Sequence, residues 1–212
     1  MKKALIVSLL SILHIGSSAS GINEIRRSEI KTYLEGYIFI NQHKTIKKNY
    51  PVATRKKLAV RTADCIIKSS EQTGIPYPIL NRLAERESNY RFWAVSNPSQ
   101  RFERQAFGIT GVKLYYWGQE LHGILPKNIQ RKINHATNHL VLYKKYAKQI
   151  GFNIEWGANR LKKYYDKFGS MRLALLAYNT GSSSRETRRA KNDITYLNNH
   201  KYVQFVYHGI KK

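Results

Sequence analysis

Two glutamates stand two positions apart in the stretch LAERESNYRFW (83–93), in a chain that is otherwise strongly basic. On a helix over 78–88, Glu87 falls at the end of an apolar stripe that starts at Ile79. Glu85 falls on the opposite face, next to arginines, so we expect it among solvated groups. Helical phase therefore predicts different surroundings for the two carboxylates.

A carboxyl group at the end of an apolar stripe is suited to proton transfer. Burial disfavours the ionised form and raises the pKa, so the group can hold a proton near neutral pH. Such a group can protonate the leaving oxygen of a glycosidic bond. The helix pattern also fits a structural acid that pairs with one of the many arginines. From the pattern alone, Glu87 is a candidate general acid or a buried ion-pair partner.

The composition indicates an anionic partner. The chain has 212 residues, with 37 Lys and Arg against 13 Asp and Glu, which gives a net charge of +24. That charge suits nucleic acid, an anionic membrane surface or an anionic cell-wall polymer. The hydrophobic share of 42% is ordinary for a globular protein. We find no basic-aromatic strand motif or recognition helix, so nucleic acid is not the expected partner.

The N-terminus is typical of a secretory signal peptide. A positive MKK start is followed by a short apolar run over 4–15 and by the small residues GSSAS. The run is too short to span a bilayer comfortably. An uncleaved anchor or an ordinary buried helix is the alternative. We expect an exported protein in the periplasm, outside the cell or in the cell wall.

The remaining chain is predicted to be mainly α-helical. Apolar residues recur with helical spacing from Leu58, and the loop TGIPYP separates this helix from the next one, which starts near Pro78. Further on, Ser170 is a candidate N-cap and Gly181 a candidate helix end. The expected organisation is a signal peptide over 1–20, an N-terminal extension over 21–57, a catalytic domain over 58–205 and a basic tail over 206–212.

No residue pattern predicts a metal or a cofactor. The His and Cys residues lack metal-ligand spacing, and there is no glycine-rich phosphate loop. The single cysteine, Cys65, stands in the apolar stretch ADCII. We expect it to be a buried, unreactive thiol that forms no intramolecular disulfide.

Four motifs follow LAERESNYRFW or overlap it in a fixed order. They are ESNY, AFGI, NI..G...L and AYNTG, and their order is more specific than any one of them. Over 58–202 this arrangement resembles the soluble lytic transglycosylase family, whose catalytic domain is similar to goose lysozyme. The resemblance implies a lysozyme-like fold that acts on peptidoglycan glycan strands, with no cofactor and no metal.

The same resemblance assigns roles to single residues. It places the catalytic acid/base at Glu87. Substrate-binding positions fall on Ser88, Tyr90, Ser96, Gly108, Tyr178 and Asn179. From the residues alone, Tyr178 also fits plain core packing, and Asn179 fits a helix cap. The late segment ITYLNN is similar to one near the family's C-terminal end, with Tyr196 in the tyrosine position.

One position departs from the family pattern. The family usually reads Gly-Leu-Met-Gln where this chain reads GITG, so Gly111 replaces a glutamine. A substrate hydrogen bond is then lost or supplied elsewhere, and the hydroxyl of Thr110 is the candidate replacement.

The resemblance implies cleavage of the MurNAc–GlcNAc bond without water, which leaves 1,6-anhydro-MurNAc ends. Hydrolysis of the same bond, as in a lysozyme, and non-catalytic binding to the wall are the alternatives. The expected protein is a monomer after signal cleavage. A secretion or conjugation apparatus in the cell envelope is a plausible partner, alongside wall turnover and phage entry as other settings.

Overall fold

The computed structural model describes residues 24–96, 99, 101–135 and 139–210. The expected signal peptide over 1–20 therefore lies outside the described residues. Most of the described chain is helical, so the prediction of a mainly α protein is confirmed. Among the described residues, no helix is both long and apolar enough to cross a membrane.

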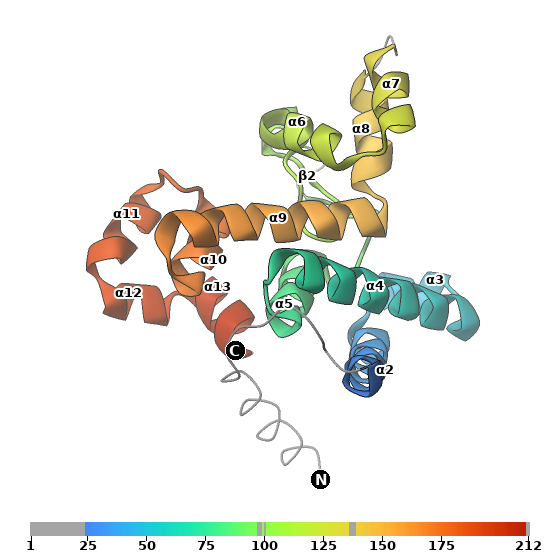
Figure 1. Ribbon diagram of the computed structural model, residues 1–212, viewed down its shortest axis with the longest axis horizontal. Helices are drawn as coiled ribbons and strands as arrows, with labels where there is room; N and C mark the ends of the chain where they lie inside the picture. Colours follow the sequence, from blue (N-terminus) through green and yellow to red (C-terminus); the bar gives the residue numbers. More distant parts are fainter. Residues whose placement is uncertain (1–23, 97–98, 100, 136–138, 211–212) are drawn as a thin grey trace.

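Helix α9 (Ile150–Phe168) crosses the middle of the molecule, and the other helices are arranged around it (Figure 1). On one side lie α2 (Glu24–Asn41), α3 (Lys44–Asn49), α4 (Val52–Thr73) and α5 (Tyr77–Ser88). On the other side lie α6 (Leu114–Ile124), α7 (Lys127–Asn134) and α8 (His139–Ala147).

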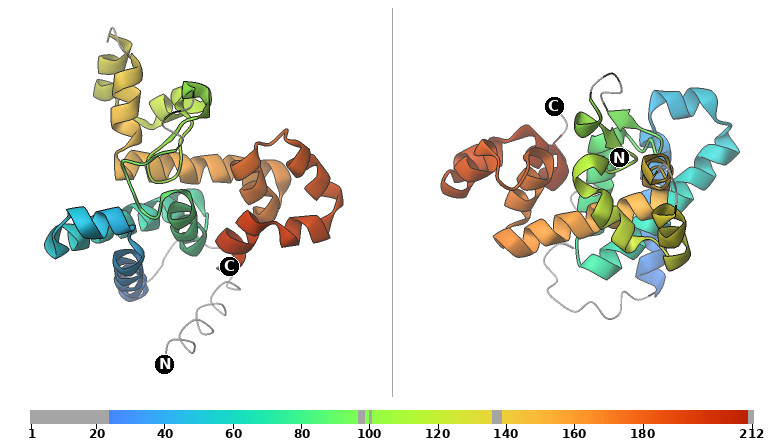
Figure 2. Two further views of the ribbon diagram at one scale, coloured as in Figure 1. Left: turned by 180° about the vertical axis from the view of Figure 1, so that it is seen from behind. Right: turned by 90° about the horizontal axis from the view of Figure 1, so that it is seen from above.

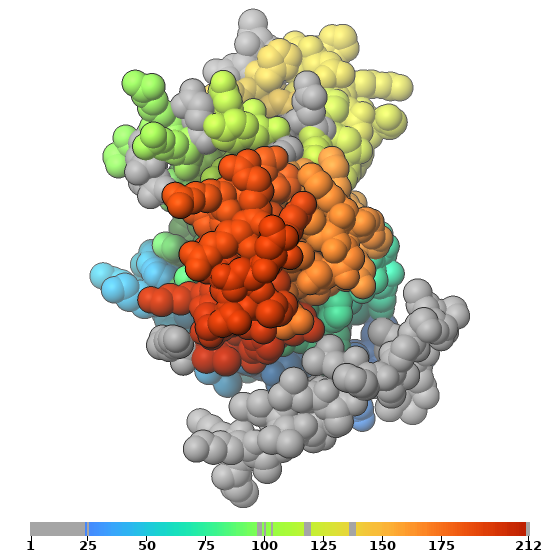
Figure 3. All heavy atoms as spheres, turned by 90° about the vertical axis from the view of Figure 1, so that its left-hand side faces the viewer, coloured from blue at the N-terminus to red at the C-terminus, as the bar shows by residue number. Residues whose placement is uncertain are grey.

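The C-terminal segments gather at the end of α9. They are α10 (Met171–Thr180), α11 (Arg185–Asn192), α12 (Ile194–Asn199), α13 (Lys201–Val203) and a π-helical turn, η3 (Gln204–His208). Views from behind and from above show the same grouping (Figure 2). In the space-filling view these helices lie between the region of α6–α8 and the N-terminal helices (Figure 3).

The helix boundaries follow local signals in the sequence. Pro51 immediately precedes α4, and Gly74 ends it with φ +70°, a conformation that suits glycine. At the start of α10 the Ser170 hydroxyl accepts a hydrogen bond from the Leu173 amide, and Gly181 ends the helix. The predicted caps at Ser170 and Gly181 are therefore confirmed, whereas α4 begins six residues before the predicted Leu58.

The segment over 95–124 differs from its prediction. It contains two short strands, β1 (Val95–Ser96) and β2 (Ala106–Phe107), with a short 3-10 turn, η2 (Phe102–Arg104), between them, and the sequence did not predict them. The two strands pair antiparallel, with Val95 opposite Phe107. Helix α6 was not predicted, because its exposed aromatic residues hide a clear apolar stripe.

The main core joins α5 to α9 and α10. Leu83 and Ala84 of α5, Ala158 of α9 and Leu176 of α10 are all fully buried in one cluster. This confirms the predicted apolar stripe of α5. Because the stripe is anchored on two other helices, the C-terminal end of α5 is held in a fixed position.

The predicted solvent exposure of Glu85 was wrong. Its side chain is 5% exposed, and its Oε2 accepts a hydrogen bond of 2.8 Å from the Tyr37 hydroxyl. Tyr37 belongs to α2, which packs mainly on α4. The face of α5 that was expected to be solvated packs against η3. The phase of one helix cannot show that a distant segment covers its outer face.

Candidate active site

Glu87 lies in the last turn of α5, where the chain leaves the helix through an unusual turn. Asn89 and Tyr90 both have positive φ, at 48° and 65°, and they redirect the backbone just after the helix. The Tyr202 hydroxyl of α13 donates a hydrogen bond of 2.5 Å to Glu87 Oε1. The carboxyl group is therefore oriented both by its helix and by a residue 115 positions later.

The surroundings of Glu87 favour its protonated form. Burial raises the pKa of the Glu87 carboxyl group above its usual value. The hydrogen bond from Tyr202 and the positive charges of Arg86 and Lys113 act in the opposite direction without cancelling that effect. The group is thus suited to give up a proton and then to exist as a hydrogen-bonded carboxylate.

Tyr178 of α10 lies close to this carboxyl group. Its hydroxyl donates a hydrogen bond of 2.8 Å to the carbonyl of Thr110. Burial, followed by the nearby charge of Glu87, raises the pKa of Tyr178 well above its usual value. The ring also packs 6.1 Å from that of Trp156. Both predictions for Tyr178, core packing and a position at the site, therefore fit: its ring packs in the interior, and the residue also lines the pocket beside Glu87.

The turn over 108–111 is held by Asn153 of α9. The Asn153 amide donates to the carbonyls of Phe107 and Ala147, at 3.0 and 2.6 Å, and its Oδ1 accepts from the Thr110 amide at 2.6 Å. Gly108 has φ +77°, and a Cβ there would stand 2.1 Å from the Ala147 carbonyl oxygen. Only glycine fits this position, so Gly108 shapes the turn.

Thr110 does not replace the missing glutamine. Its side chain is 2% exposed, and its hydroxyl lies 2.9 Å from the Asn153 carbonyl oxygen and 2.8 Å from Asn153 Oδ1. The hydroxyl therefore faces α9. It is the backbone carbonyl of Thr110, through Tyr178, that contributes to the site.

Gly111 lies directly against the acid. Its φ is +73°, and a Cβ at this position would stand 2.9 Å from Glu87 Oε2. Any side chain here would press on the carboxyl group and strain the backbone. The departure from the family pattern therefore falls next to Glu87.

A pocket of about 400 Å³ opens beside Glu87. It is lined by Glu87, Ser96, Arg104, Ala106, Gly111, Lys113, Tyr116, Trp156, Arg160, Tyr164, Tyr178, Asn179, Thr180 and Gly181. Of the predicted site residues, the structure brings Glu87, Ser96, Tyr178 and Asn179 together here. Glu87 is the single acidic side chain among the described residues that line it.

Ser88 and Tyr90 do not line this pocket. The Ser88 hydroxyl is buried against the carbonyls of Ile109, at 2.9 Å, and Ala84, at 3.1 Å. The Tyr90 hydroxyl donates to Asn81 Oδ1 at 3.0 Å, and its side chain is 3% exposed. Both residues belong to the ESNY motif, but at the end of α5 their side chains point inward. In this structure they hold the end of α5 in place, as Gly108 and Thr110 hold the next turn.

The sequence analysis missed Tyr202. It placed the late tyrosine of the resemblance at Tyr196, which lies beside His200 and beneath the Arg189 guanidinium instead. Helical spacing could have found the residue, since Tyr202, Val203 and Val206 are all buried and fall on one face.

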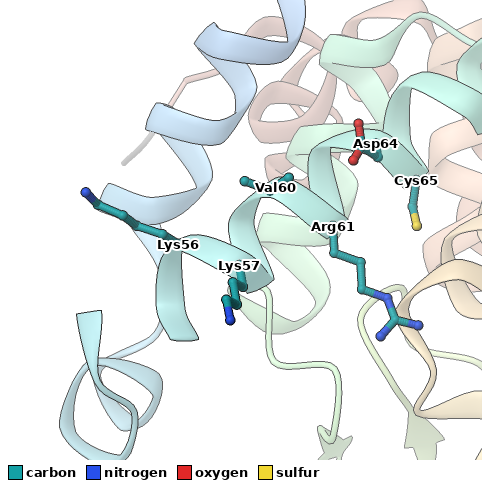
Figure 4. Close-up of a pocket in the computed structure, with 6 residues that line it drawn as sticks. All are labelled: Lys56, Lys57, Val60, Arg61, Asp64 and Cys65. Carbon is teal, nitrogen blue, oxygen red and sulfur yellow. The ribbon is translucent and has the colours of Figure 1, made fainter. Parts of the chain in front are cut away.

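A second pocket lies on α4 and shares no lining residue with the first (Figure 4). Lys56, Lys57 and Arg61 border it together with Cys65. Cys65 is a free thiol that is half-buried, less than expected, and burial raises its pKa. No group of three or more His, Cys, Asp or Glu side chains that could hold a metal occurs within the part of the chain that the structure describes.

Comparison with known protein families shows which family this domain belongs to. A family model described as the Transglycosylase SLT domain matches residues 64–199. The chain belongs to the SLT transglycosylase family. The match includes Glu87, the 108–111 turn, Asn153 and Tyr178, and it supports lytic transglycosylase activity on peptidoglycan in general. No curated protein and no solved structure matches the chain.

The boundaries of the SLT match are informative. The match begins within α4 and ends with α12, so α2 and α13 lie outside it. Tyr37 and Tyr202, which donate to the two glutamates of α5, belong to these outer helices. This SLT domain therefore uses segments on both sides of the matched region to complete its catalytic helix.

Proposed function

We propose that this SLT domain cleaves the bond between N-acetylmuramic acid and N-acetylglucosamine in peptidoglycan without water, and that Glu87 is its single acid/base. The observation that carries this proposal is the isolation of Glu87. Among the described residues, no other carboxylate lines the pocket, and burial raises the Glu87 pKa. Glycosidases that act through two carboxylates need a second one beside the sugar.

In the first step, protonated Glu87 donates its proton to the glycosidic oxygen. The bond from that oxygen to C1 of the muramic acid then breaks, and the freed sugar leaves with a new hydroxyl group. Positive charge develops at C1, where the acetamido group of the substrate stabilises it, as in substrate-assisted glycosidases. Glu87 is left ionised, and the hydrogen bond from Tyr202 stabilises this form.

In the second step, ionised Glu87 takes the proton of the C6 hydroxyl on the same muramic acid. The C6 oxygen closes onto C1, which gives the 1,6-anhydro end and returns Glu87 to its protonated state. Both steps use one carboxyl group whose pKa is raised enough to act as acid and then as base. Tyr178 and Asn179 line the pocket next to this group and are suited to position the sugar.

Analysis of the products tests the proposal. Purified sacculi are digested with the protein, and the soluble fragments are examined by mass spectrometry. Anhydro ends on the new fragments support the proposal, whereas reducing ends throughout would show a lysozyme-type hydrolase. If sacculi bind the protein but are left uncut under all conditions, the protein is a wall-binding protein.

We also propose that the protein is exported, as its N-terminal sequence predicts. Export would bring the basic chain to anionic wall material. Fractionation of producing cells, together with the N-terminal sequence of the mature protein, tests this: a mature chain that still begins at Met1 in the cytoplasmic fraction would contradict it.

A further inference from the structure

The pocket beside Glu87 carries an excess of positive charge. Arg104, Lys113 and Arg160 line it, and they come from three separate segments of the chain. Glu87 is the single acid that faces them among the described lining residues, and its protonated form is neutral. Neutral sugars are recognised mainly through hydroxyl and amide hydrogen bonds, which do not require three cations.

Arg160 forms the inner part of this charged wall. Its side chain is only 6% exposed. The guanidinium donates to Glu120 Oε1 at 3.0 Å and to the Tyr164 hydroxyl, so it is held firmly. Lys163 also donates to Glu120 Oε1 at 3.0 Å. One carboxylate is thus shared by two cations of α9, and Arg160 is held at the pocket wall by these contacts.

Arg104 and Lys113 form the outer part. Both side chains are exposed, and neither makes an ion pair with an acid within the described part of the chain. The charge of Lys113 reaches Glu87, whose pKa it lowers. Trp156 also lines the pocket, and its indole N–H has no acceptor among the described residues. The wall therefore presents donors and positive charge.

We propose that this wall, formed by Arg104, Lys113 and Arg160, binds a carboxylate carried by the glycan strand near the bond that is cut. The proposal rests on the proposed function and adds a specificity to it. Guanidinium and ammonium groups that line one partly enclosed pocket favour an anionic oxygen pair over a neutral group. The protein would therefore select strands by the charge of the substituent on the muramic acid.

Two substituents could supply such a carboxylate. The stem peptide carries several, and the lactyl group of muramic acid carries one when the peptide has been removed. Three substrates separate these sources: strands with peptides, strands stripped by an amidase, and stripped strands whose lactyl carboxylates have been methyl-esterified. The measured quantity is kcat/KM at one fixed ionic strength, because exposed charges are screened by salt.

We expect kcat/KM on the esterified strands to be about tenfold or more below that on the better charged substrate, as for loss of a charged hydrogen bond. Whichever charged substrate is cut faster identifies the source of the carboxylate. Equal values on all three substrates would overturn the proposal and leave the proposed function intact.

A pair of double variants separates a local site from general attraction. In Arg104→Gln/Lys113→Gln, the preference for charged strands should fall to less than threefold. The control is Lys57→Gln/Arg61→Gln on α4, which lowers the net charge equally but lies at the other pocket (Figure 4). The control should keep the full preference; if both variants lose it equally, long-range attraction explains the effect and the proposal is wrong.

Binding provides a readout that does not depend on catalysis. The Glu87→Gln variant is titrated with short fragments from the same three substrates. If the unmodified protein cuts none of them, the proposed function fails, while weaker binding of the esterified fragments still supports the carboxylate site. Equal binding of all three fragments would overturn it.

Discussion

The two glutamates of α5 have similar partners but different access. Glu85 is 5% exposed and accepts a hydrogen bond from Tyr37 of α2. Glu87 accepts one from Tyr202 of α13, but it also lines a pocket of about 400 Å³. Glu85 also borders a pocket, of about 440 Å³, on another part of the surface beside Arg86 and Lys201. What distinguishes Glu87 is that its side chain is only half-buried and that Tyr178 and Asn179 line the same pocket.

The comparison also separates two uses of the regions outside the SLT match. Helix α2 supplies a hydrogen-bond donor to a buried acid of α5, which is a contribution to stability. Helix α13 reaches the reacting group itself, which is a contribution to chemistry. We expect variants on the two sides to show these two kinds of loss separately.

The largest expected effect comes from exchanging each acid for its amide. Glu87→Gln removes the proton donor, so the rate of cleavage should fall by about 10²–10⁴-fold. Glu85→Gln keeps a side-chain acceptor for Tyr37 and lies outside the pocket beside Glu87, so its rate per folded molecule should stay within about threefold. Release of soluble fragments from sacculi measures both. A comparable loss of rate in Glu85→Gln would remove the distinction between the two acids.

Tyr202→Phe should show the next largest effect. It removes the donor that favours ionised Glu87, so the pKa of the acid should rise further. The high-pH limit of activity should then move to higher pH, because the protonated form persists longer. The rate at its optimum should fall by about tenfold, since the carboxylate intermediate loses a hydrogen bond. A pH–rate profile measures both changes, and an unchanged high-pH limit would contradict the assigned role.

Tyr37→Phe should instead affect stability. It removes the hydroxyl that donates to buried Glu85, and the free energy of unfolding should fall by about 1–3 kcal/mol. The cleavage rate of the folded protein should change little. Urea unfolding measures the loss, with Tyr165→Phe as the control, since Tyr165 is 40% exposed on α9. Equal stability of the two variants would show that the bond to Glu85 is unimportant.

The smallest expected effect concerns stability as a function of pH. Because the pKa of Glu87 is raised in the folded state, the folded protein holds this proton more tightly than the unfolded chain. The stabilisation that this tightly held proton gives the folded protein is complete at pH values below the unfolded pKa of Glu87. It is lost as the pH rises through the folded pKa. Glu87→Gln should therefore have a higher melting temperature than the unmodified protein at pH 7, and the difference should shrink near pH 4. A constant difference across that range would argue against a raised pKa.

The sequence predicted the parts of the site that depend on local pattern. Periodicity placed the apolar face of α5, caps placed the ends of α10, and ordered motifs identified Glu87 and Tyr178. The burial of Glu85 could not be predicted in this way, since it depends on two segments far away in the sequence: η3, which packs on α5, and Tyr37 of α2, which donates to the acid. The roles of Ser88 and Thr110 were missed because the direction of each side chain is set by turns with positive φ.

The charged wall of the pocket was equally invisible in the sequence. Arg104, Lys113 and Arg160 are three among 37 basic residues, and nothing in their local sequence distinguishes them. These three residues line the same pocket only because the β1–β2 segment and α9 pack together in the fold. Contacts between distant segments depend on the complete fold, so the pattern of a single helix cannot predict them.

The bond between Tyr202 and Glu87 also sets an order of events during synthesis. The two residues are 115 positions apart, so a growing chain exposes Glu87 long before its partner has been made. Until then the catalytic helix has no hydroxyl to orient its acid, and contacts of such long range form late. We therefore expect a nascent chain to become catalytically competent only when its C-terminal helices have emerged and docked.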